Sequence, residues 1–283
     1  MEKFKIAGIG EVLWDLLPTG KMIGGAPANF CYHAKNLGAD AAIISATGKD
    51  ALGAEIENTL TEKGIKHILN HPDYPTGTVS VELKNGIPDY IIHQNVAWDF
   101  IRLGAEAVSW IKNADALCFG SLCQRSVVSA EAINQALDAV TDRTLKVLDV
   151  NLRQHYFSQL FLEKSFKRAN VVKLNDEEIE IIGAMFGLSG SQNLKCRALM
   201  NLFQIDVVAL TMGEKGSLLL TTNEESFVPV PKVKVIDTVG AGDSFTAVMV
   251  MGLLNKKPLH ELHNEATEYA AKVCTFSGAM PSF

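Results

Sequence analysis

The chain has 283 residues, 47% of them hydrophobic, which is enough apolar material for a buried core in one large α/β domain. Its 26 basic and 32 acidic residues give a formal net charge of −6, which argues against non-specific binding of nucleic acid. No apolar run is long enough to span a bilayer, and the N-terminus lacks the apolar core of a signal peptide. The five cysteines are scattered and lack zinc-ligand spacing. We therefore expect a cytoplasmic protein with free thiols and neither a nucleic-acid nor a membrane partner.

Short apolar runs alternate with amphipathic, helix-like segments along most of the chain. Strands are predicted at residues 6–9, 41–46, 116–119, 146–150, 171–174, 207–211 and 218–221. Helices are predicted at residues 26–37, 51–63, 127–141, 176–186 and 192–203. This alternation is typical of an α/β protein whose mainly parallel sheet is covered by helices on both faces. Binding sites in such sheets lie at the carboxyl ends of the strands.

Two segments, at about residues 12–23 and 76–97, interrupt this alternation. The second predicts a β-hairpin with an Asn85-Gly86 turn. Together they could form a small β lid on a single domain that comprises residues 1–283. A plain surface hairpin is the alternative, and the pattern leaves it open.

The segment Asp237-Thr-Val-Gly-Ala-Gly-Asp-Ser-Phe245 carries the strongest chemical signal. A strand-like run at residues 233–236 precedes it, and an apolar helix is predicted for residues 244–254. Glycine-rich backbone that leads into a helix N-terminus presents N–H groups and a positive dipole end to an anion. Asp243 lies at this point and could take a proton from a hydroxyl that attacks a phosphate. Within this segment alone, a helix-capping role for Asp243 is equally good.

A second segment, Gly24-Gly25-Ala26-Pro27-Ala28-Asn29-Phe30, adds to this signal. The two segments resemble the N-terminal and C-terminal signatures of the PfkB, or ribokinase-like, family of carbohydrate kinases, and the resemblance covers essentially the whole chain. It implies a ribokinase-like three-layer α/β/α domain with a β lid. It also implies transfer of the γ-phosphate of MgATP to a sugar hydroxyl. Asp243 would be the base, and the N–H groups of Gly240, Ala241 and Gly242 would stabilise the developing charge.

The resemblance also implies a sugar site. Asp15, Gly25 and Asn29 would contact the sugar. Arg153 ends the segment Asp149-Val-Asn-Leu-Arg153, which resembles the D-x-N-x-R segment of fructokinases and 2-keto-3-deoxygluconate kinases, and it would bind the sugar or the transferred phosphate. The structural alternatives are a solvated carboxylate for Asp15, a helix cap for Asn29 and a surface salt bridge for Arg153.

The remaining implied sites concern the nucleotide and metal ions. Asn175 and Glu178 match an N-x-x-E motif that organises Mg²⁺, mainly through water, although the same residues also form a good helix start. Thr211, Gly213 and Gly216 match a T-x-G-x-x-G nucleotide loop. A helix at residues 269–276 would wall the adenine pocket. Some relatives bind a monovalent cation such as K⁺ near residues 237–239 and 277–278, and the lid often supports a homodimer.

Within this class, the expected activity is that of a fructokinase. A 2-keto-3-deoxygluconate kinase or a ribokinase is the alternative, and the choice depends on residues 93–98, including Gln94 and Asn95. A nucleoside kinase and a non-catalytic sugar sensor are further rivals. The chain lacks a G-x-x-x-x-G-K-[ST] motif and protein-kinase signatures, which excludes Walker-type NTPases and protein kinases. A Rossmann dehydrogenase is disfavoured because Gly8-Ile-Gly10 lacks the third glycine.

Overall fold

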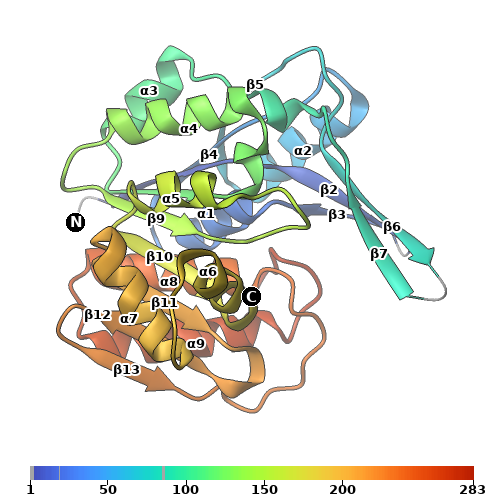
Figure 1. Cartoon of the computed structure of the whole chain (residues 1–283). Helices are drawn as coiled ribbons and strands as arrows, with labels where there is room; N and C mark the ends of the chain where they lie inside the picture. Colours follow the sequence, from blue (N-terminus) through green and yellow to red (C-terminus); the bar gives the residue numbers. More distant parts are fainter. Residues whose placement is uncertain (1–2, 19, 85–86) are drawn as a thin grey trace.

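The computed structural model describes residues 3–18, 20–84 and 87–283, so the predicted Asn85-Gly86 turn lies outside the described residues. In the described chain, one sheet of nine strands runs through the centre of the molecule (Figure 1). Its spatial order is β13 (Glu225–Val228), β12 (Ser217–Thr221), β11 (Val207–Thr211), β10 (Val171–Asn175), β9 (Leu145–Asp149), β8 (Ala116–Gly120), β1 (Lys5–Ile9), β4 (Asp40–Ala46) and β5 (Lys66–Asn70). Neighbouring strands are parallel from β11 to β5, and only the β11–β12 and β12–β13 pairs of this sheet are antiparallel.

Helices cover both faces of this sheet, which confirms the predicted α/β/α layering (Figure 1). One face packs against α1 (Ala26–Asn36), α2 (Ala51–Glu62), α8 (Ala241–Leu254) and α9 (Leu259–Val273). The other face packs against α3 (Ala105–Lys112), α4 (Val127–Ala139), α5 (Gln159–Phe166), α6 (Asp176–Phe186) and α7 (Gln192–Phe203). Short 3₁₀ helices lie in the connections: η1 (Ala97–Phe100), η2 (Leu122–Arg125) and η3 (Gly213–Lys215).

Adjacent strand residues belong to opposite cores. Val171 and Val207 pack on the α1/α8 side, whereas Val172 and Val208 pack on the opposite side. Successive side chains of a strand point to opposite faces, so a strand buried on both faces must be apolar throughout. The continuous apolar runs in the sequence therefore have a direct structural cause.

A second sheet of four strands projects from one side of the molecule, and we call it the lid sheet (Figure 1). Its order in the described chain is β3 (Gly20–Gly24), β2 (Leu13–Leu17), β6 (Thr78–Lys84) and β7 (Ile87–Ile92). Trp14 anchors the base of this sheet because its side chain is buried and its indole N–H donates to the carbonyl of Leu52 at 3.0 Å.

Several details of the predicted elements are wrong. Residues 233–236 form no strand, and Val235 and Ile236 are exposed, because no neighbouring strand pairs with this segment. The last helix spans Leu259–Val273 and so ends before the predicted residues 274–276. The apolar pattern also missed β5, β13, α3 and α5, which are short, and β5 and β13 are the two edge strands of the main sheet. No described helix has the length and apolar character needed to cross a bilayer.

Candidate active site

Polar residues collect where the parallel strands of the main sheet end. Glu11 follows β1, while Asp149, Asn175 and Thr211 are the last residues of β9, β10 and β11. From β1 the chain adds β4 and β5 on one side and then returns to add β8 on the other. A crevice at such a reversal of strand order is the usual binding site of an open α/β sheet.

The glycine-rich turn forms the N-terminus of α8. Gly240 is the N-cap and has a left-handed φ of 79°, and a Cβ at this position would lie 2.6 Å from the Cα of Ala279. Only glycine fits both constraints. Asp243 lies in the first turn and no side chain caps the helix, so the capping interpretation of Asp243 is wrong. Of the three predicted anion donors, the Ala241 N–H already has a partner, the carbonyl of Thr238 at 3.3 Å.

Asp243 and Asn29 connect the two signature segments. The Asn29 amide donates to Asp243 Oδ2 at 2.7 Å, although the residues are 214 positions apart. Burial raises the pKa of Asp243 to about 6, Asp149 adds to the rise, and Lys173, Asn29 and Arg153 oppose it. A carboxyl with such a pKa is mostly ionised at neutral pH and can act as a base. Asn29 does not cap α1, because Gly25 is the N-cap of that helix.

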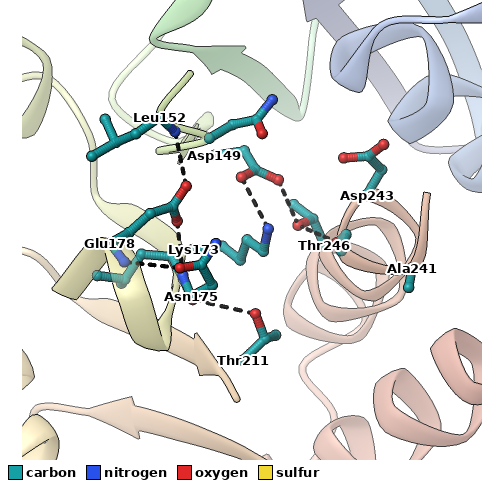
Figure 2. Close-up of polar contacts among 12 residues, drawn as sticks. Asp149, Leu152, Lys173, Asn175, Glu178, Thr211, Ala241, Asp243 and Thr246 are labelled. Carbon is teal, nitrogen blue, oxygen red and sulfur yellow. Dashed lines mark hydrogen bonds and ion pairs between the residues drawn. The ribbon is translucent and has the colours of Figure 1, made fainter. Parts of the chain in front are cut away.

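A buried charge network that the sequence analysis missed lies beside this carboxylate. Figure 2 shows Lys173 and Asp149 side by side, with Lys173 Nζ 3.2 Å from Asp149 Oδ1 and the Thr246 hydroxyl donating to Asp149 Oδ2 at 3.3 Å. A Cβ on Gly242 would lie 2.7 Å from Lys173 Nζ, so the ammonium sits against the first turn of α8. Burial alone would lower the pKa of Lys173, but the surrounding carboxylates raise it above its ordinary value. A lysine within an apolar strand was the available sequence signal.

Asn175 and Glu178 form the predicted helix start. Asn175 Oδ1 accepts from the Glu178 N–H at 2.8 Å, and Glu178 Oε2 accepts from the Asn175 N–H at 2.8 Å. Glu178 Oε1 accepts from the Leu152 N–H at 2.8 Å, so this buried side chain ties the loop after β9 to the start of α6 (Figure 2). Burial also raises the pKa of Glu178.

The described residues contain no group of three or more His, Cys, Asp or Glu side chains placed to hold a metal ion directly. Each oxygen of Glu178 nevertheless keeps a second lone pair, which can accept from a metal-bound water. Mg²⁺ usually retains several waters and needs few protein ligands. The residues therefore fit Mg²⁺ that is held through water rather than in an all-protein cage.

Arg153 and Asp15 approach the site from the β9 loop and the lid sheet. Arg153 is exposed. Burial raises the pKa of Asp15 to about 6, and the positive charge of Arg153 opposes this rise. Asp15 lies on β2, and a Cβ on Gly24 would lie 2.4 Å from its Oδ2, so the glycine leaves room for this carboxylate. The Gln154 amide donates to the carbonyl of Tyr90 at 2.6 Å, which joins the Arg153 loop to the lid sheet.

Glu11 is a further residue of this site, and no sequence motif indicated it. Its side chain is 2% exposed, and its backbone packs against Gly25, where a Cβ would lie 2.3 Å from the Glu11 carbonyl oxygen. Burial raises the pKa of Glu11 to about 7, and nearby Asp243 and Arg153 push it in opposite directions. Its position directly after the first buried strand was the signal that could have identified it.

The predicted nucleotide loop lies at the same edge of the sheet. Thr211 pairs with Asn175 in the β10–β11 ladder, and Gly213 and Gly216 have left-handed φ values of 55° and 112°. Lys215 within this loop forms an ion pair of 3.1 Å with Asp176 at the start of α6. The loop therefore lies beside the Asn175–Glu178 helix start.

Two other predicted regions have contrasting positions. Asp237 Oδ2 accepts from the Gly278 N–H at 2.9 Å, so the two segments named for a monovalent cation do meet.

Near the lid sheet, Gln94 donates to the Tyr156 hydroxyl at 2.9 Å, and Asn95 has a left-handed φ of 55°. Trp98 is fully buried in the core and cannot line a sugar pocket.

Comparison with known proteins agrees with this geometry. Residues 18–283 match the profile of the family described as "pfkB family carbohydrate kinase". A putative sugar kinase, PH1459, of Pyrococcus horikoshii is 29% identical over 90% of this chain and 84% of its own length. Its crystal structure in complex with ATP has a TM-score of 0.80 at 27% identity and covers 97% of this chain and 94% of that one.

Two fructokinases are also similar to this chain. Fructokinase-1 of Oryza sativa subsp. japonica is 25% identical over 98% of this chain and 94% of its own length. A double mutant of Vibrio cholerae O395 fructokinase, solved with fructose, ADP and a potassium ion, has a TM-score of 0.80 at 25% identity. That match covers 99% of this chain and 95% of that one.

Proposed function

Because this chain belongs to the pfkB family of carbohydrate kinases and is an ATP-dependent sugar kinase, we propose that its acceptor is fructose. The similarity to fructokinases over nearly the whole chain supports this choice. The Asp149–Arg153 segment, which resembles that of fructokinases, supports it as well. The observation that carries the transfer chemistry is the 2.7 Å contact between Asn29 and Asp243, because it joins the expected sugar contact to the expected base. The choice of fructose among the sugars rests on the similarity to fructokinases.

Asp243 is the proposed general base. It takes the proton of the acceptor hydroxyl while that oxygen attacks the γ-phosphorus of ATP in line, and the bond from this phosphorus to the bridging oxygen of ADP breaks. Asn29 orients the carboxylate by donating to one of its oxygens. Asp15, Gly25, Asn29 and Arg153 hold the sugar in this proposal.

The N-terminus of α8 receives the charge that develops on the transferred group. In this proposal the N–H groups of Gly240, Ala241 and Gly242 donate to it, because the first N–H groups of a helix have no carbonyl acceptor within the helix. The Ala241 N–H would give up its 3.3 Å contact with the Thr238 carbonyl when the ligand binds. Lys173 adds a fixed positive charge against Gly242. Mg²⁺, when bound, would neutralise phosphate oxygens, and Asn175 and Glu178 would hold it through water. Thr211, Gly213 and Gly216 would line the nucleotide.

Three further parts of the proposal concern its setting. The contact between Asp237 and Gly278 supports a K⁺ site in that loop pair. The projecting lid sheet supports a homodimer formed through it, which light scattering would test. The five cysteines are all free thiols, which supports a reducing cytoplasm as the location.

The test is ADP release from MgATP with fructose, 2-keto-3-deoxygluconate, ribose, tagatose and adenosine as acceptors. We expect turnover with fructose, and a loss of at least roughly 10²–10⁴-fold in Asp243→Asn with little change in folding or sugar binding. Asp142→Asn makes the same substitution at an exposed position and serves as the matched control. Near-normal turnover by Asp243→Asn would refute the assignment of the base.

The panel also separates the rival activities. Preferred turnover of 2-keto-3-deoxygluconate, ribose or adenosine would assign one of the alternative kinase activities instead. Sugar binding without any ADP release would indicate a sugar sensor.

A further inference from the structure

His33 is a buried histidine on α1 to which the proposed chemistry assigns no role. Both of its ring nitrogens have partners: Nε2 lies 2.8 Å from the carbonyl oxygen of Ala279, and Nδ1 lies 3.2 Å from the hydroxyl of Tyr269. A carbonyl oxygen only accepts hydrogen bonds, so Nε2 carries the ring proton and Nδ1 accepts from Tyr269. Burial lowers the pKa of His33 to about 4, so the ring stays neutral at neutral pH.

Ala279 lies directly against the glycine-rich turn at residues 240–242, which we call the anion-binding turn. A Cβ on Gly240 would lie 2.6 Å from both the Cα and the Cβ of Ala279, and 3.0 Å from its carbonyl oxygen. That carbonyl oxygen is the one to which His33 donates, and Ala279 is itself buried. His33 therefore holds the residue that backs the N-cap of α8, although 246 positions separate it from Ala279.

Two other side chains fasten the same short segment. The Tyr32 hydroxyl donates to the carbonyl of Pro281, and Lys63 Nζ donates to the carbonyl of Met280 at 2.9 Å. Three successive carbonyls, at residues 279–281, are thus bound by side-chain donors from α1 and from the end of α2. The segment behind the anion-binding turn is therefore fixed by hydrogen bonds as well as by packing.

Helix α1 consequently reaches the start of α8 at two points. Asn29 donates directly to Asp243. His33 is four positions later, and so on the same face of α1, and it acts on Gly240 through Ala279. The first contact orients the proposed base, and the second supports the turn whose N–H groups are proposed to receive the developing charge.

We propose that His33 is a positioning residue for phosphoryl transfer: its hydrogen bond to Ala279 holds the anion-binding turn where it can receive the charge of the transferred group. The catalytic part of this inference rests on the proposed function of the turn. His33 lies beyond the signature-like segment at residues 24–30, and its effect reaches the reacting groups through Ala279.

His33→Leu tests the inference, because leucine fills buried space but cannot donate to Ala279. Hydrogen–deuterium exchange of the full chain, followed in peptides from residues 237–244, reports on the turn without requiring turnover. The N–H groups of Ala241 and Ser244 are bonded within this segment, to the carbonyls of Thr238 and Gly240. We expect them to exchange faster in the variant, because the support behind the turn is lost.

Steady-state kinetics with the best acceptor of the panel measure the catalytic effect. In His33→Leu, kcat should fall by at least roughly tenfold, because a misplacement of about 1 Å in an active site can cost about 10²-fold. KM for the acceptor should change little, since the turn acts on the transferred group rather than on the sugar. A general loss of stability would not produce this split.

Two other variants separate the hydrogen bond from stability. His33→Gln can place an amide N–H near the position of Nε2, so it should recover much of the slow exchange and of kcat. His263→Leu is the matched control, because His263 is also fully buried, has a pKa lowered to about 4 and bonds to serines of β12 and β13. It meets α8 at Phe245, beyond the turn. It should cost stability without selectively changing kcat or exchange at residues 237–244.

Tyr269→Phe is a milder variant that serves if His33→Leu does not fold. It keeps the ring but removes the hydroxyl that donates to Nδ1, so the histidine is held less firmly. Exchange at residues 237–244 should rise, by less than in His33→Leu.

The possible results distinguish this inference from the proposed function. Unchanged exchange of the turn in His33→Leu, or in Tyr269→Phe where the first variant does not fold, would overturn the inference. So would an equal change in His263→Leu, no recovery in His33→Gln, or faster exchange with an unchanged kcat. Turnover of no acceptor by the wild type would refute the proposed acceptor, while the exchange measurement would still decide whether His33 holds the turn.

Discussion

Asp243 must be ionised to accept a proton, and its surroundings set the pH at which this happens. Burial and the nearby Asp149 raise its pKa to about 6, against the opposing effect of Lys173, Asn29 and Arg153. The base is therefore ionised above about pH 6 and neutral below it. We expect kcat/KM for the sugar to fall as the pH drops through about 6, because this parameter reports the free enzyme. An acid limb near pH 4, the ordinary range of an aspartate, would contradict the raised pKa.

Lys173 and Asp149 form a buried pair whose members depend on each other. Their side chains are 9% and 6% exposed. Lys173→Met leaves Asp149 and Asp243 without this counter-charge, so it should destabilise the fold by about 3–5 kcal/mol. The double variant Lys173→Met/Asp149→Asn removes both charges and should be less destabilised than the sum of the single variants. Urea unfolding of all four proteins measures this coupling, and strict additivity would contradict it.

At the scale of elements, the start of α8 depends on one glycine. Gly240 has a left-handed φ, and Ala279 blocks the place of a Cβ. Gly187, at the end of α6, has a similar φ of 66° but has no atom within 4 Å of that place. Alanine substitution at Gly187 therefore tests backbone strain alone, whereas the same substitution at Gly240 adds a steric clash at the anion-binding turn.

Gly240→Ala should cost more stability than Gly187→Ala. Both substitutions force alanine into a left-handed conformation at a cost of about 1–2 kcal/mol. Gly240→Ala should also move the α8 N-terminus and lower kcat by about 10²-fold, because misplacement of about 1 Å has this effect in active sites. Thermal unfolding and ADP release measure the two effects. Equal kcat in both variants would argue against a role for this turn in charge stabilisation.

At the scale of the whole molecule, the loop after β9 connects the lid sheet to the main sheet. Glu178 accepts from Leu152 on one side, while Gln154 donates to Tyr90 on the other. The hydroxyl of Tyr156 in the same loop accepts from Gln94 and lies 3.4 Å from the carbonyl of Ile92. Movement of the lid sheet would therefore also move Arg153.

Tyr156→Phe removes these hydroxyl contacts while keeping the ring. We expect KM for the sugar to rise several-fold with a loss of stability of only about 1 kcal/mol, since one or two hydrogen bonds are lost. Tyr74→Phe, at an exposed ring that stacks on Phe100, is the matched control. Steady-state kinetics with fructose and with ATP measure the effect, and an equal rise in KM for ATP would show that the loop does not act on the sugar side.

The amino-acid sequence by itself determined the layered α/β fold and its mainly parallel sheet. Strands buried on both faces need unbroken apolar runs, and helices buried on one face need periodic ones, so both patterns are local and visible. The helices Asp176–Phe186 and Gln192–Phe203 were predicted with the observed bounds. The glycine turn before Asp243 was also visible, because backbone that binds an anion at a helix start leaves a local signature.

Only the tertiary structure decided which distant residues meet. The pairs Asn29–Asp243 and Lys173–Asp149 join segments far apart in the chain, and nothing local in either segment specifies its partner. The segment at residues 233–236 is apolar enough for a strand, but a strand also needs a neighbour with which to form hydrogen bonds, and none is present in the described structure. Burial likewise raises the pKa of Glu11 to about 7, which its place after a strand did not reveal, because desolvation depends on everything packed around a group.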